Sequence, residues 1–297
     1  MRIFAPATSA NLNVGFDVLG VALQPLEGEP LGDWVSAELA RQDSFSVSGP
    51  YADSLGEPAG NVVVQAWQRY RQLCGQQPPL ALHLHKGMPV GSGLGSSAAS
   101  VVAAVLAIDG QCQQLSTQQK LALMAELEGR LSGAVHWDNL LPCLYGGLRL
   151  GEQALPVPDN WLWLVAYPPV SLETRKMRAL LPDTISRSAA SAQASRLGQF
   201  VAALYRQDGA GAAALMTDPL VEPYRAPLIP GFDAQKTALL HAGALAAGLS
   251  GSGPTVFAVF DDINKAQQAA DQLREWAAGG FVKLCRTDMQ GARQAEA

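Results

Sequence analysis

The chain of 297 residues is poor in cysteine, with only Cys74, Cys112, Cys143 and Cys285. These residues lie far apart and form no C-x-x-C pair, which argues against a disulfide framework and against a structural zinc site. Dispersed single cysteines in a chain of this size are typical of a reducing cytosol. We therefore expect a cytoplasmic protein.

Basic residues and long apolar runs are also scarce. The chain has 21 Lys and Arg against 26 Asp and Glu, a net charge of −5, so it lacks the basic footprint of a protein that binds nucleic acid or anionic membranes. Residues 1–6 show no apolar signal segment, and the longest apolar run, 98–108, is too short to span a bilayer. A hydrophobic share of 48% is too high for a disordered chain. We expect a soluble globular protein with neither nucleic acid nor membrane as partner.

The N-terminal half predicts a mixture of strands and helices. Residues 80–85 alternate apolar and polar side chains, which is typical of a half-buried strand. Asn61 suits the N-cap of a helix over 61–73, and the small apolar residues of 96–109 predict a buried helix. The remaining elements expected here are strands at 18–23, 35–39 and 146–150 and a helix from Ser116 or Thr117 to about Leu131.

The character changes after residue 150. Residues 151–160 are polar with two prolines and indicate either a domain boundary or a long hairpin. Beyond them we expect strands at 161–167, 255–260 and 281–286, and helices at 172–181, 189–205, 209–216, 232–242 and 263–278. The last β-α-β run fits half of a ferredoxin-like sandwich. The sequence thus predicts an α+β protein with mostly antiparallel sheets and two domains, 1–155 and 156–297.

A glycine-rich loop, Pro-Val-Gly-Ser-Gly-Leu-Gly-Ser-Ser over 89–97, lies between a predicted strand and a predicted buried helix. Its glycines permit close backbone approach to a ligand, and the helix N-terminus behind them favours an anion. The spacing excludes a Walker loop, which needs Lys where Ser96 stands, and a G-x-G-x-x-G dinucleotide fingerprint. The loop also contains no G-x-S-x-G string, which the nucleophile elbow of a hydrolase would need. A phosphate cradle and a plain strand-to-helix turn both remain open.

Two further segments accompany this loop: Ala5–Asn11 with Val14–Asp17, and Gly248–Thr255. In this order and spacing, the three segments resemble the three motifs of the GHMP kinases (galactokinase, homoserine kinase, mevalonate kinase, phosphomevalonate kinase). Within that superfamily, the sequence is similar to the homoserine kinase family over essentially its whole length. The similarity is carried by Asn11 with Gly15–Gly20, by Val135–Asn139, and by Glu222–Arg225 with Leu228–Gly231.

The resemblance implies a two-domain GHMP kinase fold, in which an N-terminal domain carries the ATP loop and a ferredoxin-like α/β sandwich follows. The active site is expected between the two domains. The implied reaction transfers the γ-phosphoryl group of ATP to the side-chain hydroxyl of L-homoserine, with Mg²⁺ as cofactor, and gives O-phospho-L-homoserine on the route to threonine. The family habit also implies a homodimer.

The resemblance assigns the phosphate side of the site residue by residue. Ser97 and Glu128 would hold the metal, whereas Glu126, two positions away, falls on another face of its helix. Without the resemblance, either glutamate would be an ordinary solvated residue. Residues 61–63 and those around Trp67 are candidates for the adenine pocket. The residues expected to bind ATP are Pro89, Val90, Gly91, Ser92, Gly93, Leu94, Gly95, Ser96, Ser97, Ala98 and Ala99.

The substrate side follows from the same resemblance. A zwitterionic substrate needs cations for its carboxylate, which Arg178 and Arg225 can supply, and an anion for its ammonium, which Asp17 can supply. Both arginines could instead be surface residues. Because Arg175 and Lys176 also lie near Arg178 in the sequence, the choice of Arg178 rests on its spacing from Thr174. The rest of the expected set consists of Asn11, His136, Asp138 and Gly253 as substrate-binding residues and of Asn139 and Thr174, with Glu128, as catalytic residues.

The sequence offers no general base, because the segment from Arg2 to Val21 contains no lysine. We expect the substrate hydroxyl to lose its proton late, to the phosphate or to water, while electrostatics carries the rate. Two rival functions are an isoprenoid-type kinase and a non-catalytic amino-acid-binding module. The first would not explain paired acidic and basic residues, and the second would not need Ser97 and Glu128.

Overall fold

The computed structural model describes residues 1–170 and 172–294 of the chain. Its N-terminal half is built around an antiparallel sheet with the order β13-β1-β4-β6-β5, in which only β5 and β6 run parallel. The elements of this half are β1 (Arg2–Pro6), β2 (Thr8–Ala10), β3 (Leu19–Pro25), β4 (Gly32–Leu39), β5 (Ser44–Ser48), η1 (Ala52–Ser54), η2 (Pro58–Gly60), α1 (Val62–Cys74), β6 (Leu80–His85), α2 (Ser96–Cys112), α3 (Thr117–Ser132), α4 (Trp137–Tyr145), β7 (Leu148–Leu150) and β8 (Gln153–Leu155).

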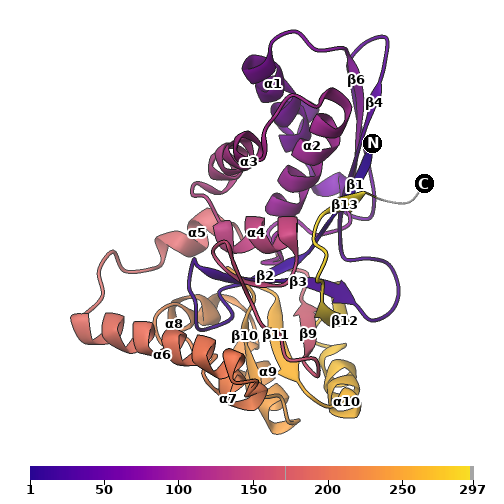
Figure 1. The fold of residues 1–297 in the computed structure, drawn as a ribbon. Coiled ribbons are helices and arrows are strands. Elements are labelled where there is room, and N and C mark those ends of the chain that lie inside the picture. The colour runs from indigo at the N-terminus through magenta and orange to yellow at the C-terminus, as the bar shows by residue number, and fades with distance from the viewer. Residues whose placement is uncertain (171, 295–297) are drawn as a thin grey trace.

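Helix α2 occupies the centre of this half. Its residues are small and apolar on all sides, as expected for a buried helix. It packs against β1 and β4 on one side and against α1 and α3 on the other (Figure 1). The predicted alternation of β6 is confirmed, because every second residue of that strand is buried. The N-terminus of α2, which the Gly-rich loop precedes, is therefore held rigidly by the packing around it.

The C-terminal half completes a ferredoxin-like sandwich. Its strands follow the chain order β9, β10, β11, β12 and lie in the sheet order β10-β11-β9-β12, with all neighbours antiparallel. The elements are β9 (Leu162–Tyr167), α5 (Thr174–Ala179), α6 (Arg187–Tyr205), α7 (Gly209–Ala214), α8 (Glu222–Arg225), η3 (Ala226–Leu228), α9 (Phe232–His241), β10 (Ala246–Leu249), β11 (Val256–Phe260), α10 (Ile263–Leu273), β12 (Phe281–Thr287) and β13 (Arg293–Gln294).

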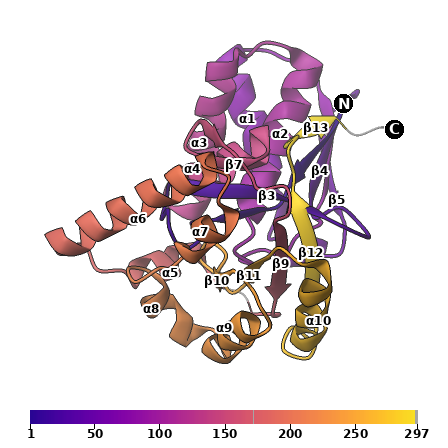
Figure 2. The ribbon, with the colours of Figure 1, turned by 60° about the horizontal axis from the view of Figure 1, so that its bottom comes forward.

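Strand β9 shows how both faces of this sheet become buried. Trp163 and Val165 point into the large core shared with the N-terminal half, and Leu162 and Leu164 point into a second core beneath α9 and α10. A strand buried on both faces is apolar throughout rather than alternating, which explains the run Leu-Trp-Leu-Val-Ala-Tyr. Figure 2 shows α9 and α10 on one side of the sheet and α6 and α7 on the other.

The two halves are joined through β3. This strand pairs with β2 and β7 in the N-terminal half and with β12 in the C-terminal half. The chain then returns from β12 to β13, which pairs with β1 (Figure 1). Of the two alternatives for 151–160, the structure shows a hairpin, since β8 pairs with β7. A domain boundary at 155 stays a prediction.

Several elements differ from the expectation. Strands β1, β2, β5 and β10 and helix α4 were not predicted, and α10 ends at Leu273 rather than near 278. Strand β2 has three residues and β10 has four, too few to show a period, while α4 contains Pro142, which normally argues against a helix. Within the described residues, no helix has the length and apolarity needed to cross a membrane.

Candidate functional site

A cavity of about 570 Å³ opens where the Gly-rich loop faces helices α3, α4, α5 and α8. It brings together sequence segments that are more than 200 residues apart, from Ala10 to Ser252. Most of the predicted site residues line it: Asn11, Asp17, Val90, Gly91, Ser92, Gly93, Gly95, Ser96, Ser97, Glu128, His136, Asp138, Asn139, Thr174, Arg178 and Arg225.

The other predicted residues lie behind the cavity wall. Pro89, Leu94, Ala98 and Ala99 are buried beneath the loop and contribute to its rigidity rather than to its surface. Gly253 is likewise buried, although its neighbours Gly251 and Ser252 line the cavity. Of the residues proposed for the adenine pocket, Asn61 and Val62 line the cavity, whereas the Trp67 indole packs in the core and donates to Asp43.

The loop presents the N-terminus of α2 to the cavity, where the first-turn N–H groups of a helix have no partner within the helix. Its backbone is braced from behind by the segment between β10 and β11. Ser250 Oγ donates to the Gly93 carbonyl at 2.7 Å, and Thr255 Oγ1 donates to the Ser92 carbonyl at 2.7 Å. The third sequence motif, Gly248–Thr255, thus holds the loop in place.

Gly93→Ala is predicted to distort this brace. Gly93 has φ +79°, and an added Cβ would lie 2.4 Å from the Ser250 carbonyl oxygen, so loop and brace must separate. We expect the KM for ATP to rise about tenfold, with a smaller loss of thermal stability. Gly198→Ala is the matched control, because a Cβ there meets nothing within 4 Å. An unchanged KM for ATP in Gly93→Ala would show that loop conformation does not govern nucleotide binding.

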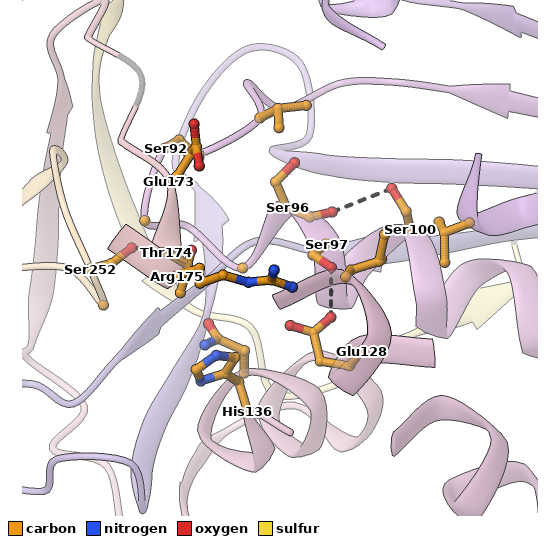
Figure 3. Close-up of a pocket in the computed structure, with 18 of the residues that line it drawn as sticks. Ser92, Ser96, Ser97, Ser100, Glu128, His136, Glu173, Thr174, Arg175 and Ser252 are labelled. Atoms are coloured by element: carbon orange, nitrogen blue, oxygen red, sulfur yellow. Dashed lines mark hydrogen bonds between the residues drawn. The ribbon is translucent and has the colours of Figure 1, made fainter. Parts of the chain in front are cut away.

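Ser97 and Glu128 meet on the phosphate side of the cavity. The Ser97 hydroxyl donates to Glu128 Oε2 at 2.6 Å, and Figure 3 shows both side chains at the end of α2 facing the cavity. Glu126 does not line the cavity and instead forms ion pairs with Arg69 of α1 and with Arg130. A hydroxyl beside a carboxylate is a donor set that suits Mg²⁺, which prefers oxygen ligands and takes few of them from protein. The residues present therefore fit the expected metal.

A buried lysine, to which no sequence pattern points, supports the loop from below. Lys86 is 2% exposed, and its ammonium donates to Asp33 Oδ2 at 2.5 Å, Ser100 Oγ at 2.9 Å and the Ser96 carbonyl at 3.0 Å. These three bonds use all three of its donors. Lys86 therefore anchors the first turn of α2 rather than offering a free cation to a ligand.

Two arginines flank the ring of Phe16 on the opposite side of the cavity. Arg178 forms a bidentate ion pair with Asp17, and Arg225 donates through Nη1 to the Gly251 carbonyl at 3.0 Å. Their guanidinium carbons lie 5.7 and 5.5 Å from the Phe16 ring centroid. Each guanidinium has five N–H donors, so both retain donors for a ligand carboxylate.

Asn139 lies between the two sides. The Thr8 hydroxyl donates to Asn139 Oδ1 at 2.7 Å. This bond orients the amide, so its NH₂ group is left to donate. Thr174 and Ser252 close the wall opposite, with their hydroxyl oxygens 3.5 Å apart. A hydroxyl of a ligand held here would face an amide donor on one side and two hydroxyl groups on the other.

Buried polar atoms without a hydrogen-bond partner gather at this cavity. Among the side chains that the structure describes, seven such atoms occur, and four of them belong to residues that line the cavity. An unpaired buried polar group costs about 1–3 kcal/mol, so a cluster of them indicates a site that a ligand completes. The four atoms are Ser96 Oγ, His136 Nε2, Asp138 Oδ1 and Arg225 Nε.

Burial also shifts the titration of these groups. It raises the pKa of Asp138 to about 7, and the nearby negative charges of Asp17 and Glu128 act in the same direction. Burial lowers the pKa of His136, which keeps this imidazole neutral near physiological pH. Burial lowers the pKa of Arg225 as well, while the negative charge of Asp17 opposes that shift. Shifted ionisable groups of both signs in one cavity are typical of a functional site.

Comparisons with known proteins agree with this geometry. The sequence matches the family described as GHMP kinases N terminal domain over residues 61–147 and that described as GHMP kinases C terminal over residues 200–279. The structure resembles a homoserine kinase from Cytophaga hutchinsonii at 36% identity and TM-score 0.87, covering 99% of this chain and 96% of that one.

Two further solved structures extend the comparison. A putative homoserine kinase from Listeria monocytogenes is 28% identical with TM-score 0.73, covering 99% of both chains. The L. major mevalonate kinase is 14% identical with TM-score 0.69, and the alignment covers 100% of this chain and 97% of that one. At this identity, the resemblance shows the fold alone. The first resemblance is close enough, over almost the full length, to place the chain in a family. The chain belongs to the GHMP kinases.

Proposed function

We propose that the protein is a homoserine kinase, which transfers the γ-phosphoryl group of ATP to the side-chain hydroxyl of L-homoserine in threonine biosynthesis. The observation that carries this proposal is the pairing of opposite charges beside the phosphate loop. Asp138 is 3% exposed with one oxygen unpartnered, and Arg225 is 3% exposed with Nε unpartnered. An α-amino acid carries an ammonium and a carboxylate that would satisfy both.

In this account the loop and the N-terminus of α2 bind the ATP phosphates. Ser97 and Glu128 would hold Mg²⁺, which supplies charge neutralisation on the phosphates when bound. Arg178 and Arg225 hold the substrate carboxylate, and Asn139 and Thr174 orient the hydroxyl. Since Asp17 is already paired with Arg178, we assign the ammonium mainly to Asp138. Asn11 holds this arrangement together, because its Oδ1 accepts from the Asp17 N–H at 2.9 Å and its Nδ2 donates to the Gly251 carbonyl at 3.2 Å.

The transfer itself is a single displacement. A new bond forms between the homoserine side-chain oxygen and the γ-phosphorus, while the bond from that phosphorus to the β–γ bridging oxygen breaks. The electron pair leaves with ADP, and the hydroxyl proton passes to a phosphoryl oxygen or to water and so to solvent. The chain's contribution is positioning and electrostatic stabilisation, which supply most of the acceleration in phosphoryl transfer.

Initial rates of ADP release test the acceptor. With saturating MgATP, we expect L-homoserine to stimulate release far above the rate without acceptor, and both mevalonate and D-homoserine to do so weakly. Mevalonate has a carboxylate but no ammonium, so it would leave Asp138 unpaired. Rapid turnover of mevalonate, with none of homoserine, would contradict the proposed acceptor while leaving the family assignment intact.

The titration of Asp138 predicts a pH dependence of substrate binding. Only the ionised carboxylate can hold an ammonium, and its pKa in the free protein is about 7. Below pH 7 we therefore expect kcat/KM for homoserine to fall about tenfold per pH unit. In the complex the ammonium favours the ionised form, so kcat should change much less over this range.

Asp138→Asn provides the comparison for this profile. The variant should bind homoserine weakly at every pH and lose the decline between pH 7 and 6. An equal decline of kcat and kcat/KM in the parent would mean that Asp138 acts as a general base rather than as the ammonium partner. A profile that is flat down to pH 6 would contradict both roles.

A further inference from the structure

Arg175 reaches into the cavity although neither motif spacing nor the family resemblance assigned it a role. It lies in α5, one residue after Thr174, and lines the cavity. Figure 3 shows its side chain extending across the cavity with the guanidinium directed toward Ser97 and Glu128. Its Nε lies 3.2 Å from the position that a Cβ on Gly133 would occupy, at the end of α3. A side chain from the C-terminal half thus crosses to the metal side of the N-terminal half.

The guanidinium of Arg175 has no anionic partner among the residues that the structure describes. The nearest acidic residue in sequence, Glu173, forms its ion pair with Lys176 at 2.7 Å. An exposed arginine would normally extend into solvent. The Arg175 side chain instead extends over the cavity, and its guanidinium N–H groups are available to a ligand.

The other cations at the cavity lie beneath the loop or on its opposite side. Beneath the loop, the Lys86 ammonium donates its three hydrogen bonds to Asp33, Ser96 and Ser100. Arg178 and Arg225 lie across the cavity at Phe16, with Asp17 and the Gly251 carbonyl as partners. The phosphate side therefore contains backbone N–H groups and hydroxyls, and Arg175 is the side-chain cation available there in the described part of the chain.

We infer that Arg175 is a catalytic residue that contacts the γ-phosphoryl group during transfer, an inference that rests on the proposed function. During transfer, negative charge spreads over the equatorial oxygens of this group, and a planar guanidinium can donate to two of them at once. Because the contact is made most strongly in the transition state, it raises kcat rather than substrate affinity. Arg175 comes from α5 in the C-terminal half, and the phosphates are held by α2 in the N-terminal half. The contact therefore requires the two halves of the chain to be packed together.

Steady-state kinetics of two variants test this inference. We expect Arg175→Ala to lower kcat about 10²-fold with the KM for homoserine unchanged within about twofold. Arg175→Lys keeps the positive charge but loses the planar, bidentate donor geometry of the guanidinium. Its kcat should therefore lie between those of Arg175→Ala and the parent. Lys176→Ala is the matched control, because it removes the adjacent cation, which does not line the cavity and forms a largely exposed ion pair with Glu173. A kcat within about threefold of the parent, or a rise in the homoserine KM alone, would overturn the inference.

A binding measurement separates this inference from the identity of the acceptor. Aluminium fluoride with MgADP mimics the transferring phosphoryl group and requires no turnover. By calorimetry without any acceptor, Arg175→Ala should bind MgADP like the parent but bind MgADP with aluminium fluoride at least about tenfold more weakly. Equal losses for both ligands, or none, would overturn the role of Arg175. If the parent proves inactive with homoserine, the proposed function fails, and this comparison still decides the role of Arg175.

Discussion

Replacing Glu128 with glutamine should lower kcat with homoserine by about 10²-fold or more. Glu128 is 3% exposed, faces the cavity from α3 and accepts the Ser97 hydroxyl at 2.6 Å. Glutamine keeps the shape and can still accept that bond, so the fold should survive. It removes the negative charge that a divalent cation needs. The concentration of Mg²⁺ that gives half-maximal rate should rise in parallel, and a magnesium titration of the initial rate measures this.

Glu126→Gln is the matched control. It removes a carboxylate two residues away in the same helix, but this one pairs with Arg69 and Arg130 outside the cavity. We expect turnover near that of the parent and at most a small loss of stability, because partly exposed ion pairs contribute about 0–1 kcal/mol. If Glu128→Gln retained full activity and an unchanged magnesium dependence, the metal assignment would be wrong.

Arg225→Leu should raise the KM for homoserine about 10²-fold while leaving the KM for ATP nearly unchanged. A hydrogen bond to a charged group contributes about 1.5–3 kcal/mol, and each 1.4 kcal/mol is about a factor of ten in affinity. Arg225 is buried beside Phe16, and its Nε has no partner in the described structure until a ligand binds. The variant therefore loses a contact that only the substrate carboxylate would make.

The fold should tolerate this change. Within the described residues Arg225 forms no ion pair, so its replacement leaves no charged partner unpaired. The Gly251 carbonyl keeps Asn11 Nδ2 as a donor at 3.2 Å. Arg206→Leu, at the exposed end of α6, controls for the loss of one arginine and should leave both KM values unchanged. An Arg225→Leu variant that changed only the KM for ATP would contradict the carboxylate role.

The sequence predicted those parts of the fold that depend on local patterns. The alternation of β6, the N-cap at Asn61 and the small apolar residues of α2 each have a local physical cause, and each is confirmed. Of the two residues predicted to begin α3, Ser116 and Thr117, the N-cap is Ser116. The ferredoxin-like sandwich is also confirmed. Strands β2 and β10 and helix α4 were not predicted, because such short strands, and a helix with an internal proline, show no recognisable hydrophobic periodicity.

The candidate site was predictable where motif spacing carried it and not where tertiary contact did. Most of the residues assigned by resemblance line one cavity, although their chemical roles stay predictions. Nothing local distinguishes Lys86 from a surface lysine at the end of a strand. Its role appears only when the fold brings Asp33, 53 positions away, to its ammonium. Arg175 was a neighbour of the chosen Arg178 in sequence, and only the orientation of α5 shows that both face the cavity.

The identity of the phosphorylated product tests the central claim most directly. Protein incubated with MgATP and L-homoserine can be followed by ³¹P nuclear magnetic resonance until the ATP is consumed. We expect a phosphomonoester signal, assigned to O-phospho-L-homoserine by addition of the authentic compound, in a one-to-one ratio with ADP. ATP that is left unchanged, or converted to ADP and inorganic phosphate without the phosphomonoester, would contradict it.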